Sequence, residues 1–426
     1  MMIARRTPKN KPPVRKNARR AARQRASTKR RRASQRAALA RRRGRGRGVD
    51  EGTLRRVATA MFEKLLHHKQ ILSVALVALG VVYAAKMTIH GIGTAMAKAR
   101  GEAMPKHGIK QVDRYMSNDK IKPRLLREGL VRAAVGSRRK IIVTMDWTDH
   151  DGDDQTTLAI SLLLRKKGRA IPLVWTTVRK SGLKHKRGLH EKTALQMLRA
   201  ALPEGVRAVV LADRGFGDTE TYDHLLGIEG FDFIIRFRGN IFVEAGDVRD
   251  KAQTLVPRNG RVRLLEGARL TAKRRGPYTV VLYKARGMKD SWHLATSLPT
   301  ENGRDIVDTY ARRFECEEGF RDLKDWRFGM ALNYTRIGTA VRRERLLTAF
   351  AIAAFLLTLV GAACERLHFD RQLRANTSTR RTHSLFRQGR EIVTGALPTA
   401  SEILCLRVFK NLLSVALREG FCNAIR

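Results

Sequence analysis

Hydrophobic and polar positions divide the middle of the chain into short runs with two different periods. Between Arg139 and Gly239, three β-rich runs (KIIVTMDWT, QTTLAISLLL and AIPLVWTTV) precede a helical run, HEKTALQMLRAAL. A short apolar run, RAVVLAD, then a second helical run and a last strand-like run, FDFIIRFRG, complete the block. Runs rich in β-branched residues between Gly and charged turns are typical of strands, and apolar spacings of three or four are typical of helices. The pattern predicts the order β-β-β-α-β-α-β, a mixed α/β domain over residues 138–239.

The pattern changes on both sides of this block. Residues 49–137 read as helices with interruptions, and residues 336–426 read as largely helical. Residues 240–300 contain short alternating runs such as YTVVLYKA, separated by Gly, Pro and charged turns. These runs predict a β-rich insertion rather than a continuation of the core. Residues 301–335 return to a helical pattern, and we expect one helix from about Arg304 to Trp326.

Two apolar runs are long enough to raise the question of a membrane. Ile71 to Ala85 contains 15 residues, which is too short to span a bilayer. Leu346 to Cys364 contains 19 uncharged residues with basic residues before it, and so reaches the length of a spanning helix. It is also rich in Ala and contains Thr and Gly. We predict core helices for both runs, and a membrane-attached protein is the alternative for the second.

The charge of the chain indicates a polyanionic partner. Lys and Arg number 86 against 39 Asp and Glu, a formal net charge of +47. Residues 1–48 contain 20 of these basic residues and no acidic ones, which predicts a disordered arm that binds polyanions. An organelle-targeting peptide and an over-extended reading frame are the alternatives for this arm. The remaining residues are still basic, with 66 basic against 39 acidic side chains.

The four cysteines indicate neither a disulfide framework nor a zinc site. Cys316, Cys364, Cys405 and Cys422 are far apart in the sequence, and none belongs to a C-x-x-C pair. We therefore expect reduced thiols, as is usual for cytosolic proteins.

A charged stretch near residue 315 carries the first candidate chemistry. In YARRFECEEGFRDLK, Tyr310, Arg313, Glu317 and Lys324 occur at i, i+3, i+7 and i+14. On a continuous α-helix these offsets fall within roughly 60° of one another, so the four side chains share one face. A carboxylate, two cations and a hydroxyl on one face are suited to holding a phosphate beside a metal ion. Glu315 and Glu318 point away from this face and are poorer ligands.

Two further carboxylates occur where strands are predicted. Asp146 lies in the first strand, and Asp213 ends the buried run RAVVLAD. Phosphodiester cleavage with two divalent metal ions needs several carboxylates from different elements, because each ion takes oxygen ligands. We therefore expect Asp146, Asp213 and Glu317 to converge. A turn-opening Asp bound by local N–H groups is the alternative for Asp213, and Arg214 is expected either to contact DNA or to pair with a carboxylate.

These residues carry a family resemblance. Asp146, Asp213 and Glu317, together with the spacing Tyr310-x2-Arg313-x3-Glu317-x6-Lys324, resemble the catalytic domain of DDE transposases of the insertion-sequence-four family, which has the YREK signature. The resemblance covers about Arg139 to Asn333. The sequence SLFRQG at residues 384–389 is also similar to the C-terminal region of that family. Residues 1–48 do not belong to the pattern.

The resemblance implies a fold and an activity. The fold is a ribonuclease H-like catalytic core made of residues 138–239 and 301–335, interrupted by the β-rich insertion and flanked by helical regions. Asp146, Asp213 and Glu317 would bind two Mg²⁺ ions, for which Mn²⁺ can substitute, and would be the catalytic residues. Tyr310, Arg313 and Lys324 would hold phosphates near the cleavage site. Independently of the resemblance, Arg214 is a candidate DNA contact, and a helical region with a basic face at residues 49–137 would suit recognition of DNA ends.

The implied reaction is cutting DNA at the ends of an insertion sequence and joining those ends to target DNA. The implied partners are double-stranded DNA, as terminal inverted repeats and as target, and a second copy of the chain on that DNA. The expected location is the cytoplasm of a bacterium, in association with the nucleoid, without membrane attachment. The alternative is a DNA-binding protein that descends from a transposase and no longer cuts.

Overall fold

The structure of the 426-residue chain is a computed structural model. It describes residues 48–425 except 165–168, 326–328, 333–334 and 380. The chain divides into two units, Met1–Gly48 and Val49–Arg426. The predicted disordered arm, residues 1–48, lies outside the described residues apart from Gly48, and all that follows concerns the second unit.

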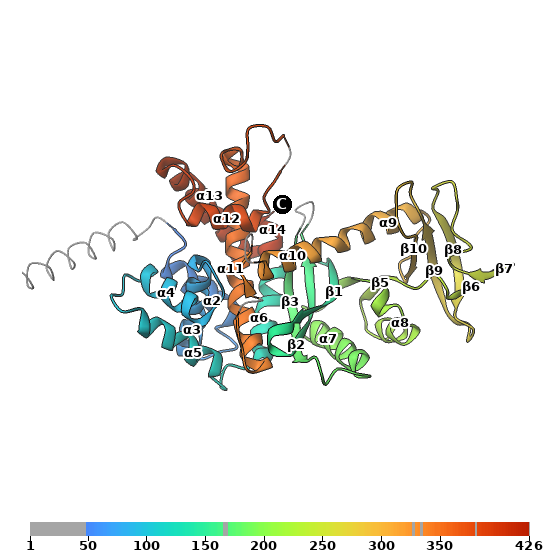
Figure 1. The fold of residues 1–426 in the computed structure, drawn as a ribbon, viewed down its shortest axis with the longest axis horizontal. Helices are drawn as coiled ribbons and strands as arrows, with labels where there is room; N and C mark the ends of the chain where they lie inside the picture. The colour runs from blue at the N-terminus through green and yellow to red at the C-terminus, as the bar shows by residue number, and fades with distance from the viewer. Residues whose placement is uncertain (1–47, 165–168, 326–328, 333–334, 380, 426) are drawn as a thin grey trace, which may run out of the picture. The chain divides into compact units, whose positions relative to one another are not determined.

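Five strands form the first half of the sheet, and two helices connect the last three of these strands (Figure 1). They are β1 (Lys140–His150), β2 (Gln155–Leu163), β3 (Ala170–Arg179), α7 (Arg187–Ala201), β4 (Arg207–Ala212), α8 (Thr219–Leu226) and β5 (Phe231–Arg236). This is the order β-β-β-α-β-α-β that the hydrophobic pattern predicted. In space the strands lie in the order β3-β2-β1-β4-β5. β2 runs antiparallel to both of its neighbours, β1 and β3, whereas β1, β4 and β5 are parallel.

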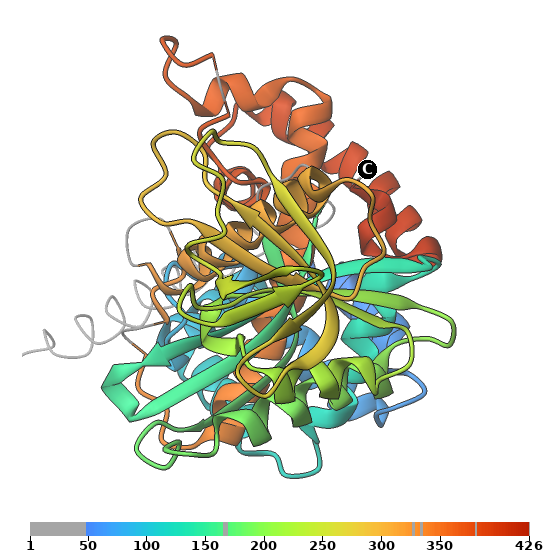
Figure 2. The same ribbon diagram turned by 90° about the vertical axis from the view of Figure 1, so that its right-hand side faces the viewer.

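The insertion extends the same sheet. Its strands are β6 (Phe242–Ala245), β7 (Val248–Lys251), β8 (Arg263–Leu270), β9 (Arg275–Tyr283) and β10 (Trp292–Thr296). β10 pairs antiparallel with β5, with Ala295 opposite Ile235, so one sheet of ten strands results (Figures 1 and 2). The predicted β-rich runs are present as strands, and they join the sheet of the preceding strands at β5 and do not form a sheet of their own. The physical reason is that β5 would otherwise leave an edge of unpaired N–H and C=O groups beside the core.

Alternation along the strands creates a separate core on each face of the sheet. Side chains of successive strand residues point to opposite faces. On β4, Val210 belongs to a cluster with Leu195 and Leu198 of α7. Its neighbour Val209 belongs to a second cluster with Ile306, which lies on α9 (Gly303–Ala311). Helices α7 and α9 therefore cover opposite faces.

Helices precede and follow the sheet. Before it are α2 (Glu51–Phe62), α3 (His68–Tyr83), α4 (Ile89–Ala99), α5 (Pro105–Ser117) and α6 (Pro123–Val135). After it are α11 (Ala340–Arg366), η5 (Phe369–Leu373), α12 (Leu385–Val393), α13 (Thr399–Glu419) and α14 (Phe421–Ala424). α11 contacts α3, α12, α13 and β3, so it joins the sheet to helices from both ends of the chain (Figure 1).

Helix α11 contains the apolar run for which a membrane was the alternative. By length and composition it is the one helix among the described residues that could cross a membrane. The rest of the chain buries all of its most apolar window. Such burial favours the prediction of a core helix. The shorter run lies in α3 and is also mostly buried.

The sequence SLFRQG has a packing role. Ser384 caps α12, because its hydroxyl oxygen accepts from the Arg387 N–H at 3.1 Å. Gly389 of α12 faces the carbonyl of Leu357, and Gly361 of α11 faces the carbonyl of Leu385, and in both places a Cβ atom would clash. The two glycines therefore allow α11 and α12 to approach closely.

Candidate functional site

Asp146 and Asp213 lie side by side where the parallel pairing of β1 with β4 ends, and β1 itself continues to His150. Met145 of β1 is opposite Ala212 of β4, and each is followed directly by one of the two acids. Adjacent strands are about 4.8 Å apart, and the carboxyl ends of parallel strands meet at one edge of a sheet, where sites commonly form. The predicted convergence of these two acids is therefore present in the fold.

Local backbone groups hold both carboxylates. Oδ1 of Asp146 accepts from the Trp147 N–H at 2.9 Å. Oδ1 of Asp213 accepts from the Gly215 N–H at 2.8 Å and caps η2 (Arg214–Phe216), as the turn-opening alternative predicted. The other oxygen of Asp213 makes no hydrogen bond to a described residue. This capping fixes the carboxylate without using both of its oxygens.

The charged stretch after α9 is not one continuous helix. α9 ends at Ala311, a 3₁₀ turn (η3, Arg312–Phe314) follows, and α10 covers Glu315–Lys324. The expectation of one helix from Arg304 was therefore wrong, and its end at Trp326 lies outside the described residues. A 3₁₀ turn advances about 20° more per residue than an α-helix, so it re-aims the following residues. α10 nevertheless lies against β1, β2 and β3.

Arg313 joins two of the predicted metal ligands. Its guanidinium lies 2.8 Å from Oε1 of Glu317 and 3.8 Å from Oδ2 of Asp146. The Arg313 side chain is only 8% exposed, whereas that of Glu317 is 54% exposed. The residue that was expected to hold a phosphate thus holds two carboxylates in this structure.

The pKa of Asp146 shows that the three acids act on one another. Burial raises this pKa from 3.8 to about 6. The charge of Arg313 opposes the rise, and the charges of Asp213 and Glu317 add to it. A cation placed at this edge of the sheet would therefore favour the charged form of Asp146.

The donor set suits a hard divalent cation. Mg²⁺ and Mn²⁺ prefer carboxylate oxygens, and the electrostatic strain on Asp146 is of the kind that a cation relieves. Among the described residues, however, no three His, Cys, Asp or Glu side chains form a ready metal-binding group. At this site, Glu317 accepts a hydrogen bond from Arg313 at 2.8 Å. The residues fit the ion in chemistry, and Glu317 would have to change partner to join the other two.

Tyr310 is buried beside this ion pair. Its ring is 2% exposed and lies 5.0 Å from the ring of Trp292 in an edge-on arrangement. Burial raises the pKa of Tyr310 to about 12, although the charge of Arg313 opposes the rise. Tyr310 therefore remains a neutral hydroxyl at physiological pH, in reach of Arg313.

The two remaining predicted DNA contacts differ from each other. Lys324 donates from Nζ to the Thr148 hydroxyl at 3.0 Å and is half-buried. Arg214 is exposed and forms no ion pair with any described residue, so the alternative of a carboxylate partner is not seen. Arg214 lies at the rim of the site, and Lys324 lies against the strand that carries Asp146.

The neighbouring acids are engaged elsewhere, as expected from their positions on the helix. Glu315 pairs with Arg312 at 3.2 Å, and Glu318 pairs with Arg321 at 2.9 Å. Neither is paired with Arg313. Glu317 is thus distinguished from Glu315 and Glu318 by its link to Asp146 through a shared guanidinium.

Glu191 is a buried acid near the site that the sequence motifs did not indicate. It is 5% exposed and accepts from the Trp147 indole N–H at 2.8 Å. Burial raises its pKa, and the charge of Asp213 adds to the rise. The sequence did contain an indication that Glu191 is buried, because it falls on the apolar stripe of its helix with Ala194, Leu195 and Leu198.

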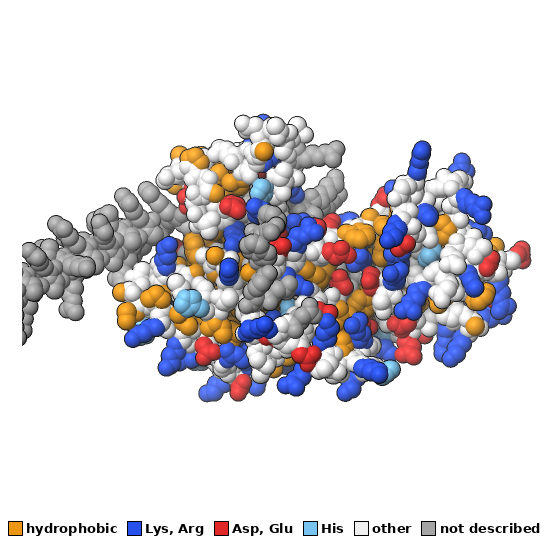
Figure 3. Space-filling view, viewed as in Figure 1, with side chains coloured by type: hydrophobic (Ala, Val, Ile, Leu, Met, Phe, Trp, Pro, Cys, Tyr) orange, Lys and Arg blue, Asp and Glu red, His pale blue; other side chains and the backbone are white. Residues whose placement is uncertain are grey.

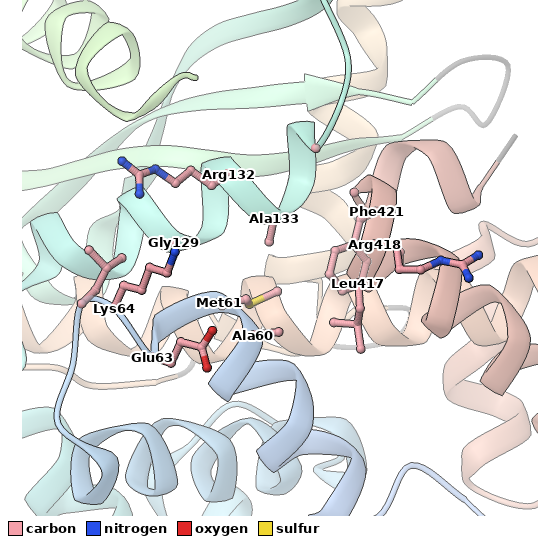
Figure 4. A pocket seen from close by; sticks show the side chains of 14 residues that line it. Ala60, Met61, Glu63, Lys64, Gly129, Arg132, Ala133, Leu417, Arg418 and Phe421 are labelled. Atoms are coloured by element: carbon pink, nitrogen blue, oxygen red, sulfur yellow. The ribbon is translucent and has the colours of Figure 1, made fainter. Parts of the chain in front are cut away.

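A pocket of about 340 Å³ lies apart from these acids, among α2, α6 and α13 (Figure 4). Lys64, Arg132 and Arg418 line it together with apolar residues. On the face that Figure 3 shows, basic side chains are spread widely with acidic ones among them. The candidate site is therefore recognised by its carboxylates beside the paired residues of β1 and β4, not by a deep cavity.

Comparison with known proteins agrees with the family resemblance in part. The family model described as a transposase DDE domain matches residues 185–354. This match supports a DDE transposase. It includes Asp213, Arg214, Tyr310, Arg313, Glu317 and Lys324, and Asp146 lies outside it.

Two further comparisons add little. No curated protein matches the chain. A cryo-EM structure of a piggyBac transposase synaptic complex with hairpin DNA is similar over 78% of this chain and 77% of that chain, with 12% identity and a TM-score of 0.37. A TM-score this low carries no argument about fold or activity.

Proposed function

We propose that this protein is a transposase of the insertion-sequence-four family that cuts DNA at the ends of its element and joins those ends to target DNA. The observation that carries the proposal is the register that puts Asp146 beside Asp213, with Glu317 linked to Asp146 by Arg313. The match to the transposase DDE domain supports it. The strand order β3-β2-β1-β4-β5 supports a ribonuclease H-like core within the larger sheet.

The three acids would hold the metal ions of the reaction. Asp146 and Asp213, fixed by backbone N–H groups, would provide the rigid part of the site. Glu317, which is more exposed, would provide the adjustable part. Two Mg²⁺ ions, or Mn²⁺ in their place, would supply an activated hydroxyl and stabilise the leaving oxygen.

The basic residues would position the phosphate. Arg313 has a planar fork of donors that suits either a carboxylate or a phosphate. A phosphate oxygen beside Arg313 would compete with Glu317 for the guanidinium, so DNA binding would release Glu317 toward the other acids. Tyr310 would orient Arg313, Lys324 would act as a point charge beside Thr148, and Arg214 would meet the backbone at the rim.

The remaining parts would serve DNA binding. The helices before the sheet would recognise terminal inverted repeats, and the basic arm of residues 1–48 would bind DNA without sequence preference. A homodimer on DNA would bring two ends together. Such a protein would work at the nucleoid in the cytoplasm of a bacterium.

A DNA-binding protein that has lost cleavage is the second candidate. It would keep the basic arm and the fold but would not need the acids. Asp146, Asp213 and Glu317 are all retained, and Arg313 and Lys324 lie against the same strand. This retention favours the enzyme.

The test is cleavage of supercoiled DNA that carries the element's own terminal repeats, with Mg²⁺. Asp213→Ala and Glu317→Gln should each reduce cleavage by about 10³-fold or more, because each removes a metal ligand. Glu318→Gln, one residue from Glu317 but paired with Arg321, is the matched control and should cut normally. Cleavage that survives Asp213→Ala or Glu317→Gln would refute the proposed function.

A further inference from the structure

The loop between β3 and α7 presents a group of exposed cations. Lys184, Lys186 and Arg187 are all exposed, and none forms an ion pair with any residue that the structure describes. Leu183, in the middle of the loop, is only 4% exposed and anchors it to the core. The cations therefore stand on a segment that is fixed at its centre.

Hydrogen bonds also fasten the start of this loop to the β1–β2 hairpin. The Ser181 N–H and hydroxyl donate to the Asp154 carboxylate at 3.1 and 2.6 Å. The Lys180 N–H donates to the Asp154 carbonyl at 3.0 Å, and the Lys180 ammonium lies 2.8 Å from the Asp149 carboxylate. A loop held in this way loses little conformational entropy when it binds a partner.

Arg187 connects the loop to the strand that carries Asp146. Its guanidinium lies over the ring of Trp147, 5.6 Å from the ring centroid. Trp147 directly follows Asp146, and strand alternation points the two side chains to opposite faces. The indole N–H of Trp147 donates to Glu191 on the same helix as Arg187. The N-terminal part of α7 therefore contacts one face of β1 through Trp147, whereas Asp146 points to the opposite face.

We propose that Lys184, Lys186 and Arg187 form a binding surface for the phosphodiester backbone of DNA that enters the candidate site. The inference rests on the proposed function, since it assigns a surface to the same DNA. The first turn of α7 has no side-chain cap, so its N–H groups add positive potential beside the three cations. Because the Arg187 guanidinium lies over the Trp147 ring, a phosphate bound to Arg187 would also affect the position of Trp147 on β1.

Contrast with other cations supports this assignment. Arg313 and Lys324 are already bound to groups of the protein, whereas the loop cations face solvent. Elsewhere on the surface many basic residues pair with acids, as Arg304 does with Asp308. An unpaired group of cations on an anchored loop is best matched by a regularly spaced polyanion.

The experiment measures the salt dependence of DNA binding by the full chain. Fluorescence anisotropy with a short mixed-sequence duplex would compare the wild type with the double variant K184Q/K186Q. Counterion release predicts that losing two phosphate contacts lowers the slope of log K against log salt by about 2. The matched control is R407Q/K410Q, which removes two exposed cations from α13 and should keep the wild-type slope.

A second measurement tests the role of Arg187. DNA binding should change the fluorescence of Trp147, measured as the difference between the wild type and W147F, and R187Q should abolish that difference signal. An unchanged slope in K184Q/K186Q, or an equal loss in R407Q/K410Q, would overturn the inference while wild-type cleavage leaves the proposed function standing. Loss of the proposed function would instead show as a wild-type chain that does not cut DNA.

Discussion

Near the point where the pairing of β1 with β4 ends, the two faces of the sheet carry cations in different environments. On the α10 face, Arg313 is nearly buried and bound to carboxylates, and Lys324 is held by Thr148. On the α7 face, Lys184 and Lys186 are exposed and no described residue pairs with them. The two faces are reached from consecutive residues of β1, because Asp146 points to one face and Trp147 to the other.

The difference shows that burial determines whether a cation stabilises the fold or remains available to bind a partner. A buried guanidinium between carboxylates offsets their repulsion and so stabilises the site. An exposed ammonium contributes little to stability and remains available to a polyanion. The α10 face is therefore expected to govern stability and chemistry, and the α7 face is expected to govern binding.

Replacement of Arg313 should have the largest effect on stability. Arg313→Gln leaves Asp146 and Glu317 without their shared cation, and loss of one partner of a buried ion pair is strongly destabilising. Because Glu317 is half exposed, we expect a loss of about 2 kcal/mol in the free energy of unfolding, measured by urea denaturation. Arg321→Gln, which breaks only the exposed pair with Glu318, should change stability by less than about 0.5 kcal/mol. Equal losses would show that burial does not distinguish these arginines.

Replacement of Lys324 should separate chemistry from binding. Lys324→Met removes a charge beside β1, and we expect single-turnover cleavage to fall by about tenfold, or about 1.4 kcal/mol in the barrier. DNA affinity should hardly change, because Lys324 is half-buried against Thr148. Arg321→Met, at an exposed position on the same helix, serves as the control for cleavage. Lowered affinity without slower cleavage would place Lys324 with the binding cations instead.

His150 should make the free energy of unfolding depend on pH, because its buried ring on the α10 face resists gaining a positive charge. Burial, as the largest cause, and the charges of Arg343 and Lys324 together lower its pKa from 6.5 to about 3. Because the folded-state pKa lies below the unfolded value, the protein loses stability as pH falls from about 6.5 toward 3. The loss from this group is at most about 1.4 kcal/mol per pH unit.

The test of this effect is the pH dependence of urea unfolding. His150→Gln should flatten the fall in the free energy of unfolding below about pH 6.5, since Gln does not titrate. An unchanged pH dependence would mean that the environment of His150 does not resist protonation.

Much of the fold was accessible from the sequence because local patterns encode it. The strand RAVVLAD and the helix HEKTALQMLRAAL are each defined by their own apolar spacing, and both occur where predicted. The break at Arg312 was not predicted, because the residues of η3 are ordinary helix formers and carry no Gly or Pro signal. The pairing of β5 with β10 was also missed, because it joins segments about 60 residues apart and no local pattern encodes a pairing partner.

The candidate site divides in the same way. The spacing from Tyr310 to Lys324 and the strand-ending Asp213 marked candidates that the fold brings to β1. The spacing did not show that Arg313 would bind Asp146 and Glu317, since that depends on how α10 lies on the sheet. Glu191 was missed because a lone acid on an apolar stripe becomes meaningful only when its partner, Trp147, is known.

By itself, the sequence determined the elements, the excess of positive charge and the identity of the candidate acids, because these depend on local residue types and spacing. The tertiary structure decided which cations are buried against acids and which face solvent. The physical reason is that burial and ion pairing depend on the register of β1 with β4 and on the helix laid on each face. Residues distant in sequence meet only through those contacts.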